Sequence, residues 1–347
     1  GAHGLFREAL NLDHQGTDSD TVRVRVQARQ TYIFAQALRM GWKPDDAAGH
    51  IASGIATLTG PARRADGLIG RTLNADGSGL LDDTPDLYDT AFALFALAEA
   101  ASALGGEEIA LAGAHSILGA MDRKMSAPDG GYAETLPQDD MRHQNPHMHL
   151  LEACLSLHRA DPEGGHLERA AKIIDLFERF FTAGPGNLLG ERFARGWTAP
   201  VARDANIVEP GHQFEWVWLL HAYARATDTP VNPAADRLYA FACSTLDEGG
   251  RAVQEVSREG AITNGSRRTW PQTKALKAHL ALFEATGEEI FAGAACTSFD
   301  VLMDECLTPD GGWIDQYDAT GKPVSHDMPA STGYHVVLAM AELIRIM

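Results

Sequence analysis

Two histidines stand near the starts of helix-like segments, where an imidazole can exchange protons at neutral pH. His212 lies in EPGHQFEWVWLL, residues 209–220, and Glu215 and Trp216 follow it at helical spacings of three and four. A carboxylate one turn away can orient an imidazole and raise its basicity, and an indole can stack on a sugar ring. This face fits a carbohydrate site. A partly buried histidine beside a core tryptophan explains the same pattern.

The second histidine, His335, lies in DMPASTGYHVVLA, residues 327–339, just inside the start of the last predicted helix. The helix dipole disfavours a charged imidazole near a helix N-terminus, so a neutral base is expected there. Taken alone, His335 fits a surface or core position equally well.

Three further side chains open another predicted helix in SRRTWPQTKALKA, residues 266–278. They are Trp270, Gln272 and Lys274, with Pro271 marking the helix start. An aromatic ring and an amide at one helix mouth suit a hydroxyl-rich ligand. The alternative for Trp270 is a core position.

A cluster of imidazoles occupies RHQNPHMHLLEA, residues 142–153. Its His147 and His149 are two residues apart, so on a helix they point in different directions and are poorly placed to bind one metal ion. No HExxH spacing occurs in the chain, and the sequence predicts no metal site. A capping or core role fits either histidine singly.

Two segments nearer the N-terminus carry the remaining candidates. Arg29 lies in an otherwise apolar helical pattern beside Tyr32, where a guanidinium needs partners such as sugar hydroxyls, a developing oxyanion or a structural carboxylate. LYDTAFAL, residues 87–94, places Tyr88 and Asp89 at a helix start, and Asp89 fits a helix cap there.

Helical periodicity dominates the chain and predicts the elements that position these side chains. Apolar residues recur at helical steps in residues 26–40, 91–104, 149–157 and 219–226, and strand-like alternation is confined to short pieces such as GRAVQEV. The candidate residues recur about every 60 positions, the length of two helices with their loops. The recurring positions are Asp89, His149, His212, Trp270 and His335.

This recurrence predicts an all-α fold of helical hairpins, and six hairpins would close an (α/α)6 barrel. We expect one catalytic domain over residues 1–347, lacking the first N-terminal helix that a complete barrel requires before Gly1. An open solenoid is the alternative, but it needs polar capping repeats, and none is evident.

Composition narrows the class of partner. The 347 residues are 45% hydrophobic and carry a formal net charge of −18, which argues against nucleic acid as a ligand. No apolar run approaches the length needed to span a membrane. The four cysteines are widely spaced, with no zinc-like or disulfide-dense pattern, so reduced thiols and a cytoplasmic location are expected.

In combination, EPGHQFEW, QNPHMHLLEA, WPQT followed by ALKA, LYDTAF, and PAST followed by YHVVLA resemble the N-acylglucosamine 2-epimerase superfamily, and within it the bacterial mannose isomerases. The resemblance runs from about residue 4 to the C-terminus. It implies an (α/α)6 barrel and an aldose–ketose isomerisation of the mannose-to-fructose type, with no metal and no redox cofactor.

The resemblance also implies roles for individual residues. His212 and His335 correspond to the acid/base pair, and Arg29, Tyr88, His149 and Glu215 to residues that position and polarise the sugar. With Trp216, Trp270, Gln272 and Lys274, these complete the predicted site. We expect His335 to move the C2 proton and His212, steadied by Glu215, to assist ring opening.

One departure bears on the substrate. The family commonly carries an acidic residue where this chain has Lys274, and a lysine there could attract an anionic sugar substituent. The alternatives left open are C2 epimerisation of an N-acylhexosamine or of a disaccharide such as cellobiose, and a non-catalytic sugar-binding or regulatory protein. The expected ligand is a monosaccharide or a disaccharide, and the expected assembly a monomer or homodimer. An inverting glycosidase is disfavoured, since it needs two carboxylates where this chain has histidines.

Overall fold

A computed structural model describes residues 2–17, 19–199 and 205–347, and most of them lie in helices. Backbone contacts divide the chain into two compact units. Unit 1 comprises Gly1–Ala9, Gly16–Leu176 and Ala194–Gly196, and unit 2 comprises Leu10–Gln15, Phe177–Phe193 and Trp197–Met347. The expectation of a single domain therefore stays a prediction.

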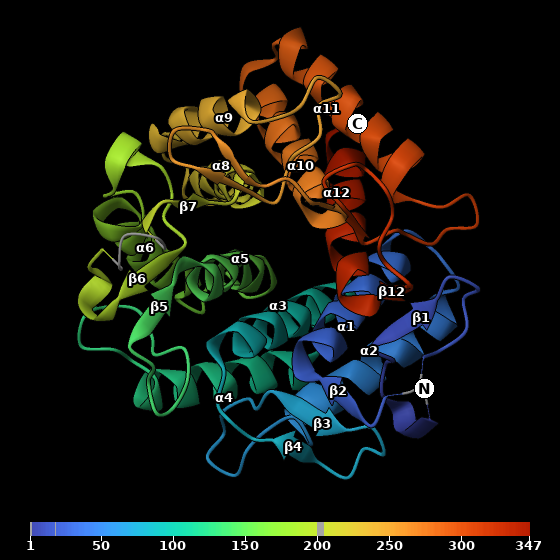
Figure 1. Cartoon of the computed structure of the whole chain (residues 1–347). Helices are drawn as coiled ribbons and strands as arrows, with labels where there is room; N and C mark the ends of the chain where they lie inside the picture. The colour runs from blue at the N-terminus through green and yellow to red at the C-terminus, as the bar shows by residue number, and fades with distance from the viewer. Residues whose placement is uncertain (1, 18, 200–204) are drawn as a thin grey trace. The chain divides into compact units, whose positions relative to one another are not determined.

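Unit 1 contains two layers of helices, blue to green in Figure 1. Helices α1, α3 and α5 pack side by side, and each forms a hairpin with the next helix along the chain. The helices are α1 (Val24–Arg39), α2 (Pro44–Thr59), α3 (Leu87–Ala103), α4 (Glu108–Lys124), α5 (Gln144–Ala160) and α6 (His166–Leu176).

The two layers differ in how their side chains are buried. Helix α3 is buried on almost its whole circumference, as its Ala-, Leu- and Phe-rich sequence requires. Helix α2 buries one stripe, Ala47, Ile51, Ile55 and Leu58, at helical spacing. The apolar residues that recur at positions 91–104 therefore belong to a helix buried on all sides and not to one with a single buried stripe.

Unit 2 repeats this arrangement in yellow to red in Figure 1. Helix α10 packs against α8 and α12, while α9 packs on α8 and α11 on α10. The helices are α8 (Pro210–Thr227), α9 (Ala234–Ser244), α10 (Thr269–Thr286), α11 (Glu289–Val301) and α12 (Ala330–Ile346). Single π turns follow α6 at Phe177–Phe181 and α11 at Leu302–Cys306, and 3-10 turns lie at Ala2–Gly4, Pro185–Asn187 and Arg195–Trp197.

Short strands precede five of the helices that carry candidate residues. Strands β2, β5, β7, β10 and β12 end within two residues of the starts of α1, α5, α8, α10 and α12. Antiparallel sheets join β2–β3–β4 in unit 1, and β7–β8–β9 and β10–β11 in unit 2. The strands are β1 (Ala9–Asn11), β2 (Thr21–Arg23), β3 (Thr72–Asn74), β4 (Leu80–Asp82), β5 (Met141–His143), β6 (Arg192–Ala194), β7 (Ile207–Val208), β8 (Glu255–Ser257), β9 (Ile262–Asn264), β10 (Arg267–Arg268), β11 (Gln316–Tyr317) and β12 (Asp327–Pro329).

This order places every predicted site residue in the first two turns of a helix of the α1–α3–α5 or α8–α10–α12 layer. The spacing of about 60 residues seen in the sequence is thus the distance from one such helix to the next. Among the described residues, no helix is both long enough and apolar enough to cross a membrane.

Candidate active site

Two carboxylates that precede α8 in the chain, those of Glu191 and Glu209, lie beside the imidazole of His212. Its Nδ1–H donates to Glu191 Oε2 over 2.8 Å, and Glu209 Oε2 lies 3.7 Å from the same nitrogen. Glu191 and His212 are both buried. Because Nδ1 faces the carboxylates, Nε2 is the ring nitrogen that can act on a ligand.

These carboxylates determine the charge of His212. Burial by itself lowers the pKa of the imidazole, but the negative charges of Glu191 and Glu209 outweigh it and raise the pKa to about 9. Burial also raises the pKa of Glu209, to about 7, against the opposing pull of His212. At neutral pH His212 is therefore an imidazolium, able to donate a proton rather than to remove one.

Glu191 also helps to fix the start of α8. The backbone N–H of Glu209, the residue before the helix, donates to Glu191 Oε1 over 3.3 Å. A single side chain therefore satisfies a donor at the helix start and holds the histidine one turn further on. The sequence did not reveal this role, because Glu191 is 21 residues from His212 in a segment without periodicity.

Trp270 lies beside both His212 and His335. The indole centroid lies 4.9 Å from the imidazole of His212 and 6.1 Å from that of His335. His335 is largely buried and also contacts the ring of Tyr334 at 4.8 Å. The three rings come from α8, α10 and α12, as the prediction of one shared site requires.

A glycine permits the close approach of Trp270 to α8. A Cβ atom at position 211 would lie 2.5 Å from Trp270 Cζ3 and 3.0 Å from Pro271 Cβ. No side chain larger than hydrogen fits there without displacing the indole. Gly211 immediately precedes His212, so the same turn carries the histidine and admits the tryptophan.

The sequence predicted that Glu215 pairs with His212, but Glu215 pairs with Lys274 instead. Glu215 Oε1 accepts a hydrogen bond from Lys274 Nζ in a buried ion pair, and Glu191 serves His212 instead. Lys274 also lies over the ring of Tyr334, 5.4 Å from its centroid. Its charge is neutralised and shielded from solvent, which disfavours an attraction to a sugar anion.

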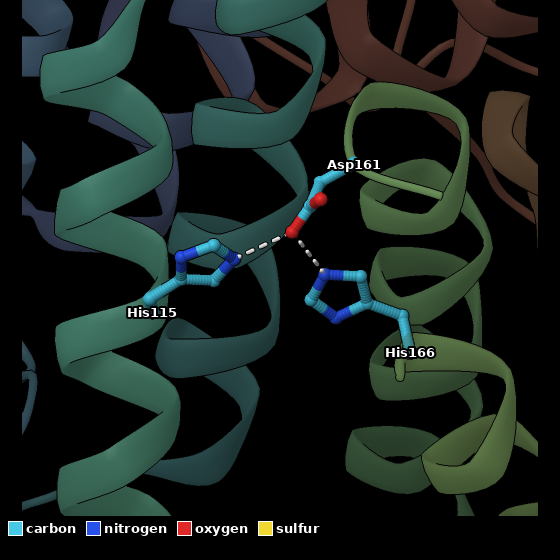
Figure 2. A group of neighbouring side chains, drawn as sticks. All are labelled: His115, Asp161 and His166. Atoms are coloured by element: carbon cyan, nitrogen blue, oxygen red, sulfur yellow. Dashed lines mark hydrogen bonds and ion pairs between the residues drawn. The ribbon is translucent and has the colours of Figure 1, made fainter. Parts of the chain in front are cut away.

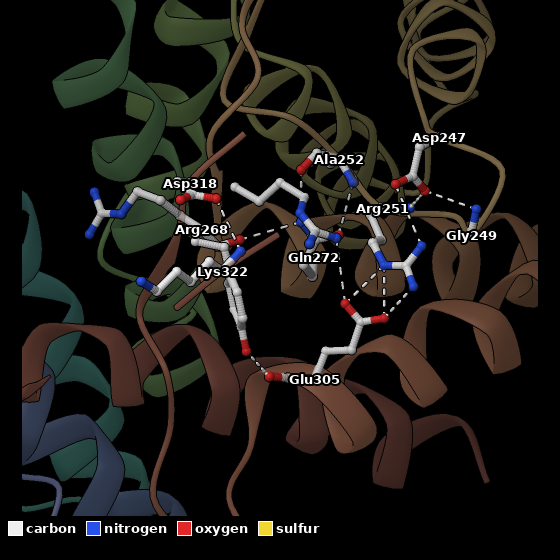
Figure 3. A network of polar contacts seen from close by, with 11 residues as sticks. Asp247, Gly249, Arg251, Ala252, Arg268, Gln272, Glu305, Asp318 and Lys322 are labelled. Carbon is white, nitrogen blue, oxygen red and sulfur yellow. Dashed lines mark hydrogen bonds and ion pairs between the residues drawn. The ribbon is translucent and has the colours of Figure 1, made fainter. Parts of the chain in front are cut away.

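Trp216 and Gln272, two other predicted site residues, are held by contacts with neighbouring parts of the protein. Trp216 is fully buried and stacks on Phe177 at 4.3 Å between centroids, so no face of the indole is exposed to a sugar. Gln272 donates to the carbonyl of Ala252 and accepts from its N–H, at 2.9 and 3.0 Å (Figure 3). Trp216 thus packs in the core and Gln272 attaches a loop, and a contact of either with the sugar stays a prediction.

The candidates of unit 1 form a group of their own. Arg29 Nη2 donates to the Tyr88 hydroxyl over 2.8 Å, and its guanidinium stacks on Phe92 at 4.1 Å. The His149 ring lies 4.5 Å from Phe92 and 5.2 Å from Tyr88, and its Nδ1 pairs with Glu152 at 3.0 Å. His147 points elsewhere, accepting from the backbone N–H of Tyr132, as its spacing from His149 predicts.

Asp89 is not the helix cap that its position suggested. Asp86 caps α3 by accepting from the Asp89 N–H over 3.0 Å. Asp89 itself is fully buried and accepts from the backbone and the guanidinium of Arg25, the shortest contacts being 2.7 Å. Burial raises the pKa of Asp89 to about 7 despite the opposing charge of Arg25.

One group near His212 could hold a metal ion. Glu191, Glu209 and His212 each offer a ligand atom, and these atoms lie within 4.8 Å of one another. Two carboxylates and one imidazole are acceptable to several divalent ions. The same contacts equally serve to hold a proton on His212, and a chelation experiment separates the two uses.

Comparisons with known proteins identify the relatives of the chain. A sequence model described as N-acylglucosamine 2-epimerase (GlcNAc 2-epimerase) matches residues 4–339. A protein of Rhizobium meliloti (strain 1021) named mannose-6-phosphate isomerase is 33% identical, over 99% of this chain and 90% of that protein.

Solved structures show the same fold. A D-mannose isomerase aligns with a TM-score of 0.90 at 21% identity, over 100% of this chain and 93% of that one. A cellobiose 2-epimerase from Bacillus thermoamylovorans B4167 aligns with a TM-score of 0.86 at 20% identity, over 99% and 93%. The predicted class, an all-α barrel of helical hairpins, is confirmed by these alignments.

Proposed function

The chain belongs to the N-acylglucosamine 2-epimerase family and is an enzyme of the isomerase class, and from this premise we propose that it interconverts an aldose and its ketose by proton transfer between His212 and His335. The observation that carries the proposal is the contact of both imidazoles with Trp270, combined with the carboxylates that hold a proton on His212.

The two histidines take different parts in the proposed reaction. His212, an imidazolium at neutral pH, donates a proton from Nε2 to a sugar oxygen during ring opening. In the same step it recovers a proton from the anomeric hydroxyl, which opens the ring to the aldehyde. His335 then removes the proton from C2 of the open-chain aldose, and the enediolate receives a proton at O1 from His212. His335 returns its proton to C1 while His212 takes the proton from O2, which gives the ketose and restores both histidines.

Trp270 supplies a flat apolar surface beside both histidines. A sugar ring packed on this indole would expose its hydroxyls to the two imidazoles at its edge. Glu191 acts as a positioning residue, since it touches His212 rather than the sugar. Substrate contacts by Arg29, Tyr88, His149 and Glu215 stay predictions from the sequence.

The names of the relatives raise the question of whether the substrate carries a phosphate. The Rhizobium meliloti protein is named for a phosphorylated mannose, whereas the solved D-mannose isomerase is named for the free sugar. The buried, ion-paired Lys274 is unsuited to a phosphate, so we propose a neutral hexose of the mannose type as the substrate. A free monosaccharide, a cytoplasmic location and a monomer or homodimer complete the proposal.

Proton exchange in deuterated water tests the reaction. We would incubate the protein with mannose, mannose 6-phosphate, N-acetylmannosamine and cellobiose and follow each sugar by NMR. Isomerisation predicts a ketose product, with deuterium at C1 where the transferred proton exchanges with solvent. C2 epimerisation predicts deuterium at C2 and the C2 epimer of the sugar without ketose.

Variants then test the assigned roles. His335→Ala should abolish exchange at carbon, and His212→Ala should slow turnover of the ring form by about 100-fold or more. The matched control is His14→Ala, which removes a partly exposed imidazole paired with Asp310. Full carbon exchange in His335→Ala would refute the base assignment, and turnover confined to mannose 6-phosphate would refute the neutral substrate.

A further inference from the structure

A second cluster of imidazoles and a carboxylate lies in unit 1, away from the residues assigned to sugar chemistry. His115 of α4 and His166 at the start of α6 both direct Nε2 at one oxygen of Asp161, the residue that ends α5 (Figure 2). The Nε2 atoms lie 2.9 and 3.3 Å from Asp161 Oδ2. Three separate segments thus present ligand atoms to one point.

The spacing of these atoms is close to that of a tetrahedral metal site. Ligand atoms bound about 2.0–2.1 Å from a tetrahedral zinc ion lie roughly 3.3 Å from one another. All three ligand atoms here lie within 4.8 Å of one another, so a small inward movement of the rings would complete the geometry. The imidazoles already stack, with centroids 5.7 Å apart and planes 16° apart.

Two of the ligand atoms lie close against a glycine. A Cβ at position 164 would lie 2.2 Å from His166 Nε2 and 2.3 Å from Asp161 Oδ2. The turn that carries it is closed by a hydrogen bond of 3.2 Å from the Gly164 N–H to the Asp161 carbonyl. The Gly164 backbone therefore packs against both ligand atoms, and a side chain there would displace them.

The two histidines differ in exposure. The His166 side chain is only 2% exposed and so is fixed in place, whereas His115 is 48% exposed and lets an ion enter from solvent.

Arg169 is the cation that faces this cluster. Its guanidinium is paired with both oxygens of Asp122 at 2.9 Å, which offsets its repulsion of a bound cation. The site itself supplies one carboxylate oxygen and two imidazole nitrogens. Imidazole nitrogens with a carboxylate oxygen select zinc and similar transition-metal ions over magnesium or calcium.

We propose that His115, Asp161 and His166 bind a divalent transition-metal ion of the zinc class, with water in the fourth position. The ion would link α4 to the turn between α5 and α6 and so stabilise the packing of unit 1. Two imidazoles and one carboxylate with an open position also resemble the ligand sets of catalytic zinc sites. This inference does not depend on the proposed isomerase activity.

Metal titration of the whole protein tests the site. After chelator treatment and dialysis, zinc binding would be measured by calorimetry and by melting temperature. The wild-type chain should bind one zinc ion, and His115→Ala should bind zinc more than about tenfold more weakly. Zinc should therefore raise the melting temperature of the wild type more than that of His115→Ala. His115 is half-exposed, so its removal should leave the fold intact.

Two further variants separate this site from other donors. Gly164→Ala keeps every ligand atom but displaces two of them, and it should weaken zinc binding in the same way. His14→Ala removes a histidine paired with Asp310 and should bind zinc as the wild type does. Any ion held by Glu191, Glu209 and His212 would be lost in Glu191→Gln instead. Equal zinc affinity and stoichiometry in the wild type and His115→Ala would overturn the proposal.

Discussion

His212 illustrates how two carboxylates can reverse the usual tendency of a buried histidine. Burial favours a neutral ring, as it does for His147, where burial first and then Arg142 lower the pKa to about 3. In His212 the charges of Glu191 and Glu209 instead hold the proton, and the pKa rises to about 9. The residue is therefore suited to act as an acid over the whole neutral range.

The pH dependence of turnover should reveal this proton. As pH rises through about 9, His212 loses the proton that it donates, so kcat/KM should fall with a limb near that pH. Glu191→Gln removes one of the supporting charges and should move the limb down by about one pH unit or more. Measuring kcat/KM against pH for the wild type and for Glu191→Gln checks this prediction. Asp310→Asn, which also replaces an acid with an amide, is the control.

Stability should follow the same titration with a definite sign. A pKa raised by folding stabilises the native state below the ordinary histidine pKa, and this stabilisation disappears as pH rises through about 9. Glu191→Gln should therefore cost more unfolding free energy at pH 6 than above pH 9. An equal cost at both pH values would show that Glu191 acts by packing alone.

The buried pair of Lys274 and Glu215 leads to a prediction about substrate choice. Lys274→Met leaves the Glu215 carboxylate buried without this cation, so urea denaturation should show a loss of about 3–5 kcal/mol. Adding Glu215→Gln should recover part of the loss. The ratio of activity on mannose and mannose 6-phosphate should stay unchanged, and a selective loss of the phosphorylated substrate would restore the anion-binding role of Lys274.

Single residues also show what the sequence could reveal about the site. His212, His335 and Trp270 were predicted because they stand at helix starts in recognisable motifs, and the structure brings their rings into contact. Glu191 was missed because it lies far along the chain in a segment of no regular pattern. Glu215 was assigned to the wrong partner, since helical spacing cannot show that Lys274 arrives from another helix.

At the scale of elements, helices were easier to predict than the strands beside them. Helices α2 and α6 bury one stripe each, and α3 and α5 are long and apolar, so both kinds leave a signal in the sequence. The strands before α1, α5, α8, α10 and α12 span two or three residues, too short for alternation to be detected. GRAVQEV overlaps β8 only at its C-terminal end.

The crossing of α8 and α10 depends on a single small residue. Gly211→Ala would place a methyl group 2.5 Å from the Trp270 ring and should push the indole away from His212. We expect destabilisation of about 1–3 kcal/mol, typical of overpacking, and a larger proportional loss of kcat/KM than of stability. Melting curves and kinetics measure the two effects.

A matched variant elsewhere distinguishes a site effect from a general one. Gly113→Ala places a methyl group 2.5 Å from Thr59 Cγ2 in unit 1, a comparable clash outside the unit that contains His212 and His335. It should destabilise the protein without a comparable change in kcat/KM. If Gly211→Ala and Gly113→Ala lower activity equally, Trp270 has no special role.

At the scale of the whole molecule, the repeat of about 60 residues accounts for both fold and site. Each repeat delivers a helix whose first turns carry polar side chains and whose remainder is apolar. The net charge argued against nucleic acid as a ligand, but composition could not identify the substrate, since a site for a neutral sugar needs only a few residues. The choice of sugar depends on contacts between side chains that are distant in sequence.

The organisation of the chain as one domain can be tested by unfolding. Five of the six tryptophans lie in unit 2 and only Trp42 lies in unit 1, whereas helices occur in both units. If the chain is one cooperative domain, tryptophan fluorescence and far-UV circular dichroism should give coincident urea transitions. We expect coincidence, because single solved structures of the same fold align with 99–100% of this chain. A fluorescence transition displaced from the dichroism transition, or two dichroism steps, would show that the units unfold independently and would contradict the single-domain prediction.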